Sequence, residues 1–276
     1  MLEIPESVTL ARQLEQTVVG KTIKSVIAAQ SPHGFAFYFG DPQEYAPLLC
    51  GRKVGYAVAR AGQVELDTDG VKLVFGDGVN MRYLMPDEPR PKKHQLLLEF
   101  NDQSVLVCTI QMYGTMLAFR NGENQNPYYL VTMEKPSPLT DQFDKAYFDQ
   151  LVESTKPTLS IKAVLATEQR IPGLGNGVLQ DILFCAGVNP KTKLDKLDST
   201  ALDRLFVSIR GTLAEMSQKG GRDTEKDLFG KYGGYQTILS KKTLKDPCPV
   251  CGGTLVRQAY LGGNVYYCPT CQPVIQ

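Results

Sequence analysis

The chain has 276 residues, of which 42% are hydrophobic and 21% are charged, and its formal net charge at pH 7 is +1. This length predicts two domains, or two domains and a small extra module, and the composition is that of a globular protein with a buried core. No stretch approaches an apolar membrane span, and the N-terminal residues lack the pattern of a signal peptide, so we expect a cytoplasmic protein that does not enter a membrane.

Charge is distributed unevenly along the chain. Residues 1–150 carry 14 basic and 18 acidic side chains, a net charge of −4, whereas residues 151–276 carry 16 and 11, a net charge of +5. A total near zero does not by itself indicate a nucleic-acid-binding protein, but the basic second half permits phosphate binding. Solvated charges scattered over the surface would explain the same numbers.

The first part of the chain, residues 1–125, is predicted to be a β-rich domain behind one leading helix. Apolar residues recur at helical spacing from Pro5 to Val19, and Gly20 ends this predicted helix. Short apolar runs then alternate with turn residues up to about residue 119, which is typical of a β-sandwich or a barrel. The predicted strands include Ile23–Ala29, Phe35–Phe39, Val71–Phe75, Leu96–Phe100, Val105–Ile110 and Thr115–Phe119.

The second part of the chain is predicted to be helical. Residues 126–140 form the predicted linker, and residues 141–240 form the predicted helical domain. The expected helices are Asp144–Glu153, Ser160–Gln169, Val178–Ala186 and Ser199–Gln218, with Ser160 and then Ser199 or Thr200 as N-caps. Gly-Gly pairs and charged residues make residues 220–240 a predicted mobile loop, although a pocket could also be built from them.

Four cysteines near the C-terminus form the most specific motif. Cys248 and Cys251 form one C-x2-C pair, and Cys268 and Cys271 form another after sixteen residues. This spacing predicts a four-thiolate zinc ribbon over residues 241–276, in which one structural Zn²⁺ has a closed coordination shell. Two disulfides are the alternative. The remaining cysteines lie in apolar stretches and are interpreted as reduced core residues: Cys50, Cys108 and Cys185.

A glycine-rich turn separates the second and third predicted helices. It reads Pro172-Gly-Leu-Gly-Asn176, and glycines such as Gly175 let another backbone approach closely. The start of a helix exposes amides that favour an anion, and Asn176 adds a neutral donor. Lys162, in the preceding helix, can supply charge. Together these groups could hold a DNA phosphate without reading sequence, although an ordinary turn between helices explains the same residues.

The order of these features is similar to that of the formamidopyrimidine-DNA glycosylase / endonuclease VIII family over essentially the whole chain. The resemblance is carried by Glu3-Ile-Pro-Glu6, by residues 171–190 and by residues 248–272. It implies an α+β multidomain fold with an N-terminal β-sandwich, a helix–two-turn–helix domain and the zinc ribbon. It further implies a monomer that clamps duplex DNA between two lobes and flips out a damaged base, with RNA left open as a ligand.

The resemblance assigns roles to several residues. Glu3 matches the family's general acid and base, and Glu6 matches the carboxylate that orients the first helix. Tyr113 lies in the loop that fills the gap left by the flipped base, and His94 aligns with a histidine that contacts DNA, although a surface histidine before a strand is the alternative. The family's intercalating methionine corresponds to Val79 or Met81.

Other positions depart from the family pattern. Family enzymes attack the sugar with the amine of an N-terminal proline, whereas residue 2 is Leu2, which should keep Met1 in place and displace the amine by about 3.3–3.6 Å of chain. Gln63 stands at the position of the catalytic lysine, Asn264 at that of the zinc-hairpin arginine, and Gln111 at that of the loop arginine.

These departures leave two hypotheses. In the first, the protein binds damaged or distorted nucleic acid, and the usual Schiff-base chemistry is weak or absent. In the alternative, it is an active DNA glycosylase and lyase whose nucleophile is the Met1 amine or a lysine, for example Lys53 or Lys72. A zinc-dependent protein-interaction module has no specific support in the sequence.

Overall fold

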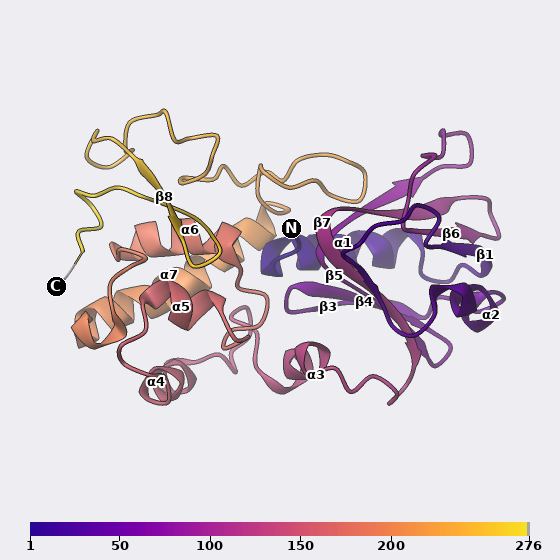
Figure 1. Ribbon diagram of the computed structural model, residues 1–276, viewed down its shortest axis with the longest axis horizontal. Coiled ribbons are helices and arrows are strands. Elements are labelled where there is room, and N and C mark those ends of the chain that lie inside the picture. Colours follow the sequence, from indigo (N-terminus) through magenta and orange to yellow (C-terminus); the bar gives the residue numbers. More distant parts are fainter. Residues whose placement is uncertain (275–276) are drawn as a thin grey trace. The chain divides into compact units, whose positions relative to one another are not determined.

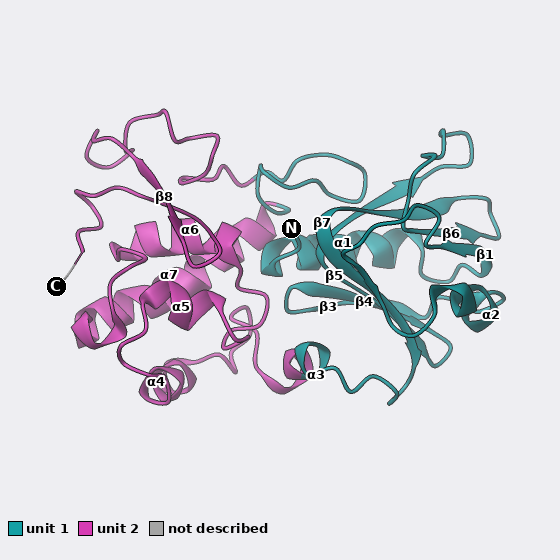
Figure 2. Cartoon of the chain, in the orientation of Figure 1, with its two compact units in different colours: residues 1–130, 220–234 teal, residues 131–219, 235–276 magenta. Residues whose placement is uncertain are grey.

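The computed structural model describes residues 1–274 and divides into two compact units. Unit 1 contains residues 1–130 together with residues 220–234, and unit 2 contains residues 131–219 and the chain from residue 235 onward (Figure 2). The predicted domain boundaries had instead placed residues 220–234 within the helical domain. Among the described residues, no helix is long and apolar enough to cross a membrane.

Unit 1 begins with α1 (Ile4–Thr17) and continues into a seven-stranded sheet (Figure 1). The strands pair in the order β1-β6-β7-β5-β4-β3, all antiparallel, and β2 pairs with β7 in parallel. Their bounds are β1 Ile23–Ala28, β2 Ala36–Tyr38, β3 Tyr56–Arg60, β4 Gln63–Thr68, β5 Val71–Leu84, β6 Leu96–Phe100 and β7 Val105–Arg120. The predicted β-sandwich with one leading helix is confirmed.

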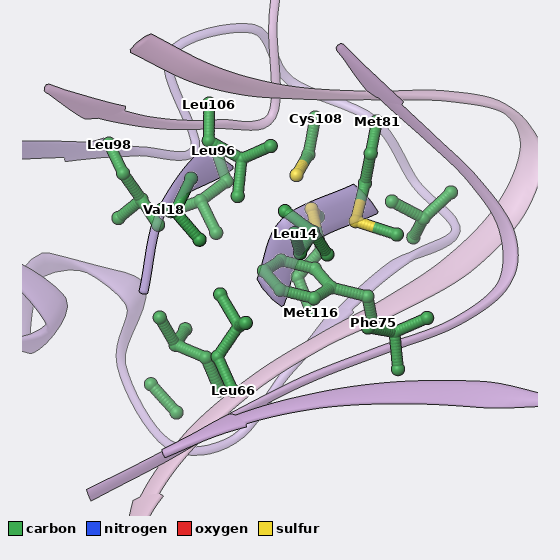
Figure 3. Packing of buried hydrophobic residues seen from close by; sticks show 14 of the residues in the cluster. Leu14, Val18, Leu66, Phe75, Met81, Leu96, Leu98, Leu106, Cys108 and Met116 are labelled. Carbon is green, nitrogen blue, oxygen red and sulfur yellow. The ribbon is translucent and has the colours of Figure 1, made fainter. Parts of the chain in front are cut away.

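The core of unit 1 lies between α1 and the strands. Leu14 of α1 lies beside Phe75, Met81 and Met116 of the long strands, and Val18, which follows α1, lies beside Leu96 (Figure 3). Successive side chains of β7 point to opposite faces of the sheet. Met116 and Ala118 therefore enter this core, whereas Leu117 and Phe119 pack on the opposite face with Tyr129. The two faces of β7 therefore belong to different environments.

Several local predictions for unit 1 were wrong. Val105–Ile110 and Thr115–Phe119 belong to one strand, because β5 and β7 stay paired on both sides of a register shift between Asp77 and Val79. The predicted linker contains α3 (Pro127–Glu134), and the chain before β3 forms η1 (Pro42–Glu44) and α2 (Tyr45–Leu49). These short elements lack enough turns to show a periodic pattern.

Unit 2 consists of helices followed by a hairpin. The helices are α4 (Lys145–Glu153), α5 (Ile161–Ala166), α6 (Asn176–Ala186), η2 (Leu194–Lys196) and α7 (Ser199–Gln218), and the hairpin is β8 (Val256–Tyr260) with β9 (Gly263–Tyr267). Ser160 caps α5 as predicted, by accepting the N–H of Ala163. The cap of α7 is Asp198, not Ser199 or Thr200, because its carboxylate accepts the N–H of Ala201.

Two further expectations are corrected. The segment expected to be mobile is packed into unit 1, where Leu228 is fully buried and Arg222 is 2% exposed. The three remaining cysteines differ from one another: Cys108 is buried in the core, whereas Cys50 and Cys185 are exposed. The apolar residues next to each cysteine in the sequence did not show whether the cysteine faces the core or the solvent.

Candidate functional site

The first two residues of unit 1 are held by the bulge in β5. The Leu2 N–H donates to the Asp77 carbonyl at 2.6 Å, and the Leu2 side chain joins the hydrophobic core at 8% exposure. Met1 remains 41% exposed beyond it. Leu2 is thus fixed by its backbone and its side chain. The terminal amine belongs to Met1, one residue earlier in the chain.

Glu3 and Glu6, the predicted acid–base and helix-orienting residues, face one buried arginine from the 220–234 segment. The Arg222 Nη2 and Nε donate to the Glu6 carboxylate at 2.8 and 2.9 Å, and Nη1 lies 3.4 Å from Glu3 Oε2. All three residues are at most 5% exposed. Burial by itself would lower the pKa of Arg222, but the two carboxylates outweigh it and raise that pKa above its usual value.

The terminal amine is also occupied by this segment. Its nitrogen lies 2.5 Å from Glu225 Oε2, and the Met1 carbonyl accepts from Arg222 Nη2 at 3.4 Å. A small cavity of about 10 Å³ is lined by Glu6, Gly221 and Glu225 among others, and it has about the volume that one water needs. An ammonium that donates to a carboxylate has no free lone pair, so it cannot attack a sugar carbon in this arrangement.

Both lysines predicted as substitute nucleophiles contact other residues of unit 1. The Lys72 Nζ is 2.8 Å from Asp67 Oδ1 and 4.5 Å from the centre of the Tyr56 ring. The backbone of Lys53 pairs with Thr22 and with the Asp69 side chain, on a different part of the sheet from Met1. The proposal that Lys53 or Lys72 supplies the nucleophile stays a prediction.

Tyr113 is the predicted stacking residue that does lie beside the N-terminus. Its hydroxyl is 3.9 Å from the Met1 sulfur, and its side chain is partly exposed. Burial, then Asp77 and Glu3, raise its pKa, so the phenol stays neutral at physiological pH. Gln63 pairs with Gly76, the residue before the Asp77 carbonyl that holds Leu2, and its amide nitrogen is 3.4 Å from the Tyr128 carbonyl.

Other residues named by the resemblance are buried. Val79 and Met81 are each 3% exposed and belong to the core, so neither is available to intercalate; the exposed Met112 was not singled out for that role. His94 is 5% exposed, with Nδ1 3.2 Å from the Pro91 carbonyl, so it is not a surface histidine. Its Nε2 has no hydrogen-bond partner within residues 1–274.

The second candidate site, in unit 2, joins the glycine-rich turn to the zinc hairpin. Lys162 donates to the Tyr260 carbonyl at 2.6 Å, and Asn176, the first residue of α6 after the N-cap Gly175, donates to the Asn264 carbonyl at 2.9 Å. Burial lowers the pKa of Lys162. The predicted residues of this group are therefore brought together, and the hairpin tip contributes two carbonyls.

The four cysteines also converge. Their sulfur atoms all lie within 4.8 Å of one another, with 3.7 Å between Cys248 and Cys271 and 3.4 Å between Cys251 and Cys268. Four sulfurs placed tetrahedrally about zinc at 2.3 Å are separated by about 3.8 Å, so the donor set and its spacing fit Zn²⁺. The alternative of two disulfides is not observed, because all four cysteines are free.

A β-sandwich unit with its N-terminal carboxylates, followed by a helical unit with a four-cysteine hairpin, defines a protein of the DNA-glycosylase class. The family model described as "Formamidopyrimidine-DNA glycosylase N-terminal domain" matches residues 1–109, and that described as "Zinc finger found in FPG and IleRS" matches residues 245–274. The chain therefore belongs to the formamidopyrimidine-DNA glycosylase family, and it carries one structural zinc site.

Individual relatives match over their whole length. A formamidopyrimidine-DNA glycosylase from Bacillus cereus is 28% identical over 281 residues, which cover 100% of both chains. The crystal structure of the MutM (Fpg) protein from Thermus thermophilus is 26% identical, with a TM-score of 0.81 over 99% of each chain. The Lactococcus lactis Fpg, solved with DNA containing an abasic site, is 25% identical, with a TM-score of 0.83 over 98% of this chain and 99% of that one.

Arg222 and Glu225 are the site residues that sequence reasoning missed. They follow the Gly220-Gly221 pair in a charged stretch, and 216 residues separate Arg222 from its partner Glu6. The glycine pair and the alternation of charges were the available signal, because they marked the segment as a possible pocket wall. Nothing local in the sequence indicated which carboxylates this arginine meets.

Proposed function

We propose that this protein binds damaged or distorted DNA, and that the Schiff-base chemistry of the glycosylase scaffold is weak or absent in it. The observation that carries the proposal is that the N-terminal site is occupied by the chain itself: Arg222 pairs with both Glu3 and Glu6, and Glu225 holds the Met1 amine. A base flipped toward this point would find the acid, the base and the amine already paired with groups of the same chain.

The substitutions elsewhere support the same proposal. A nucleophilic amine must be neutral and must lie about 3–3.5 Å from the carbon it attacks, and a shift of one residue exceeds that tolerance. Gln63 carries no charge with which to protonate a leaving group or pair with a phosphate. These losses act on one reaction, so their joint occurrence favours loss of the reaction over a change of substrate.

Support for DNA as the ligand comes from unit 2 and from the relatives. Lys162 is held at the start of α6 by a carbonyl, which is a weaker partner than a phosphate, so an incoming phosphate can replace it. The Lactococcus relative was solved with abasic-site DNA, and we propose the same class of ligand here, bound by a monomer in the cytoplasm at the nucleoid. Structured RNA is the competing ligand that a binding assay must include.

A second candidate function is an active DNA glycosylase and lyase. It is favoured by the names of the relatives and by the position of the Met1 amine, which lies at the same end of α1 as Glu3. This function requires Arg222 and Glu225 to leave the carboxylates and the amine when DNA binds, since these groups are paired with one another in this structure.

Borohydride trapping on duplex DNA with an abasic site separates the two functions. We expect no efficient trapping by the unmodified protein, trapping by the Leu2→Pro variant after methionine removal, and no gain with the exposed control Glu215→Gln. A partial gain of trapping with Glu225→Gln would show that the ion pair between Glu225 and the Met1 amine suppresses the reactivity of that amine. Binding is followed by fluorescence anisotropy on abasic, undamaged and RNA duplexes, with intact mass measured to establish whether Met1 is retained.

Efficient trapping by the unmodified protein, or release of an oxidised, ring-opened or alkylated base, would overturn the proposed loss of chemistry. Equal anisotropy on damaged and undamaged DNA would overturn the proposed preference for damage.

A further inference from the structure

We propose a second ligand site in unit 1, which takes a planar nucleobase and lies apart from the N-terminal site. The site is a cavity of about 540 Å³ between β2, the second half of β7 and residues 123–126. Binding pockets for small molecules span roughly 300–1,000 Å³, so the cavity has room for a nucleoside. The free nucleoside requires no DNA binding, so the inference stands independently of the proposed function.

The floor of the cavity is continued by one row of residues across the sheet. Gln63 on β4 pairs with Gly76 on β5, Gly76 pairs with Thr115 on β7, and Thr115 pairs with Phe37 on β2. Paired residues in neighbouring strands project to the same face. A Cβ added to Gly76 would lie 2.6 Å from the Thr115 hydroxyl, so only glycine leaves the row open at this point.

An aromatic ring lies at the end of this row. Phe37 lines the cavity and is 48% exposed, although it belongs to a strand paired with the long β7. Phe39, two residues further along the chain, also lines it and packs against Phe119 with ring centres 5.5 Å apart. The position of the Phe37 ring is fixed by the strand pairing of its backbone, and part of the ring is exposed. Such a ring can stack on a planar ligand.

Polar groups without partners gather around the same row. Asn124 lines the cavity and is 2% exposed; its Oδ1 accepts the Asn126 N–H at 2.9 Å, but its Nδ2 has no acceptor among residues 1–274. The Thr115 hydroxyl and the Gln63 Oε1 are likewise buried and unpaired there. Buried polar groups are normally hydrogen-bonded, so the unpaired Asn124 Nδ2 donor and Thr115 hydroxyl, both on residues that line the cavity, indicate a missing ligand.

The chemistry of these groups favours an uncharged, heteroaromatic ligand. Carboxamides present a donor and an acceptor side by side, which matches the edge of a nucleobase. Within the described chain the residues lining the cavity include no lysine or arginine, whereas Glu123 is among them, so an anionic group would be repelled. A sugar or phosphate must therefore face outward, and the base must face inward toward Phe37.

The cavity and the N-terminal helix lie on opposite faces of β7. Leu117 lines the cavity and packs with Phe119, whereas the neighbouring Met116 and Ala118 pack into the core that α1 covers. The cluster of Arg222 with Glu3 and Glu6 and the proposed nucleobase site are thus separate features of unit 1.

The test uses 2-aminopurine, whose fluorescence falls when it stacks on an aromatic ring. Two probes distinguish the sources of the base: free 2-aminopurine riboside, and a DNA duplex with 2-aminopurine as a single bulged nucleotide. The chain has no tryptophan, so its own emission does not obscure the probe. We expect saturable quenching of at least one probe by the full-length protein.

Two variants and one matched control assign the quenching to the cavity. Phe37→Ala should weaken binding at least about tenfold, since stacking on a single ring contributes that much. Phe35→Ala is the control, because Phe35 is 63% exposed and lies two residues away without lining the cavity. Asn124→Asp keeps the acceptor for Asn126 but replaces the Nδ2 donor by a carboxylate oxygen, and it should also weaken binding.

The outcomes separate this inference from the proposed function. Quenching of the riboside supports a site for free nucleobases, and quenching of the bulged duplex alone supports capture of a base from a strand. Anisotropy on the same duplex reports DNA binding as a whole. DNA binding without quenching of either probe would overturn the nucleobase site and leave the proposed function standing, and equal losses in the Phe35 and Phe37 variants would overturn it as well.

Discussion

The N-terminal carboxylates of unit 1 and Lys162 of unit 2 are both buried charges, yet their partners differ in kind. Glu3 and Glu6 face the permanently charged guanidinium of Arg222, whereas Lys162 donates to a neutral carbonyl. A buried ion pair is costly to open, because each partner is left uncompensated, while a lysine on a carbonyl gains energy when a phosphate arrives. The difference supports the proposal that the N-terminal site is closed to the reaction, whereas Lys162 can exchange its carbonyl partner for a phosphate.

The largest expected effect tests whether the phosphate site depends on the hairpin. Cys268→Ser should abolish zinc binding and unfold β8–β9, since metal binding supplies roughly 10–16 kcal/mol in small zinc modules. The carbonyls that hold Lys162 and Asn176 would then be lost, while the Arg222 cluster in unit 1 would persist. Zinc content and hydrogen exchange measure the two units separately.

Cys185→Ser is the matched control for the zinc experiment, because Cys185 is exposed and lies outside the cluster. Retention of zinc and of hairpin protection in the Cys268 variant would contradict the assignment.

The second-largest effect is expected when Arg222 is removed from the N-terminal site. Arg222→Met should destabilise unit 1 by about 3–5 kcal/mol, because it leaves Glu3 and Glu6 buried without a counter-charge. Adding Glu6→Gln should recover part of this loss, as measured by urea unfolding. Arg210→Met is the control: Arg210 lies 3.3 Å from the exposed Asp141, and such surface pairs contribute about 0–1 kcal/mol. An unchanged unfolding midpoint for Arg222→Met would show that the pair contributes nothing.

The third effect concerns the exchangeable site. Lys162→Met should weaken DNA binding and reduce the slope of log K against log salt by about 0.9, the value for one phosphate contact. Burial lowers the pKa of Lys162, so its contribution should also disappear at a lower pH than that of an exposed lysine. Lys219→Met, at an exposed lysine paired with Glu215, should change neither quantity. A full salt slope in the Lys162 variant would exclude this contact.

The smallest effect is a pH dependence at the bulge beside Leu2. Asp77 is exposed overall, but desolvation of its carboxyl raises its pKa, so the folded state holds this proton more tightly than the unfolded state. The associated stability is present below the unfolded pKa of about 3.9 and is lost as the pH rises through the folded value. Asp77→Asn should remove this fall in stability with rising pH and so increase stability at neutral pH. Asn tolerates the φ of 57° at this position.

Thermal unfolding between acid and neutral pH measures this difference, with the exposed Asp87→Asn as control. Parallel curves for the Asp77 variant and the unmodified protein would exclude a titrating role for Asp77.

Much of the architecture followed from local patterns, and the errors have local causes. The zinc ligands, the cap of α5 and the glycine-rich turn depend on spacings of a few residues, so the sequence displays them directly. In prediction β7 was divided into two strands and β5 was limited to Val71–Phe75, because Gly78 and Gly114 interrupt their apolar runs although the two strands pair past the bulge. Short α2 and α3 gave no period to detect.

The amino-acid sequence by itself determined the order of the elements, the metal ligands and the loss of the proline, lysine and arginine of the family chemistry. Only the tertiary structure decided that Arg222 and Glu225 close the N-terminal site, and that Gln63, Gly76, Thr115 and Phe37 form one row. The physical reason is distance along the chain: spacing and periodicity report neighbours within a turn or a hairpin, whereas a charge pair across 216 residues depends on how the whole unit packs.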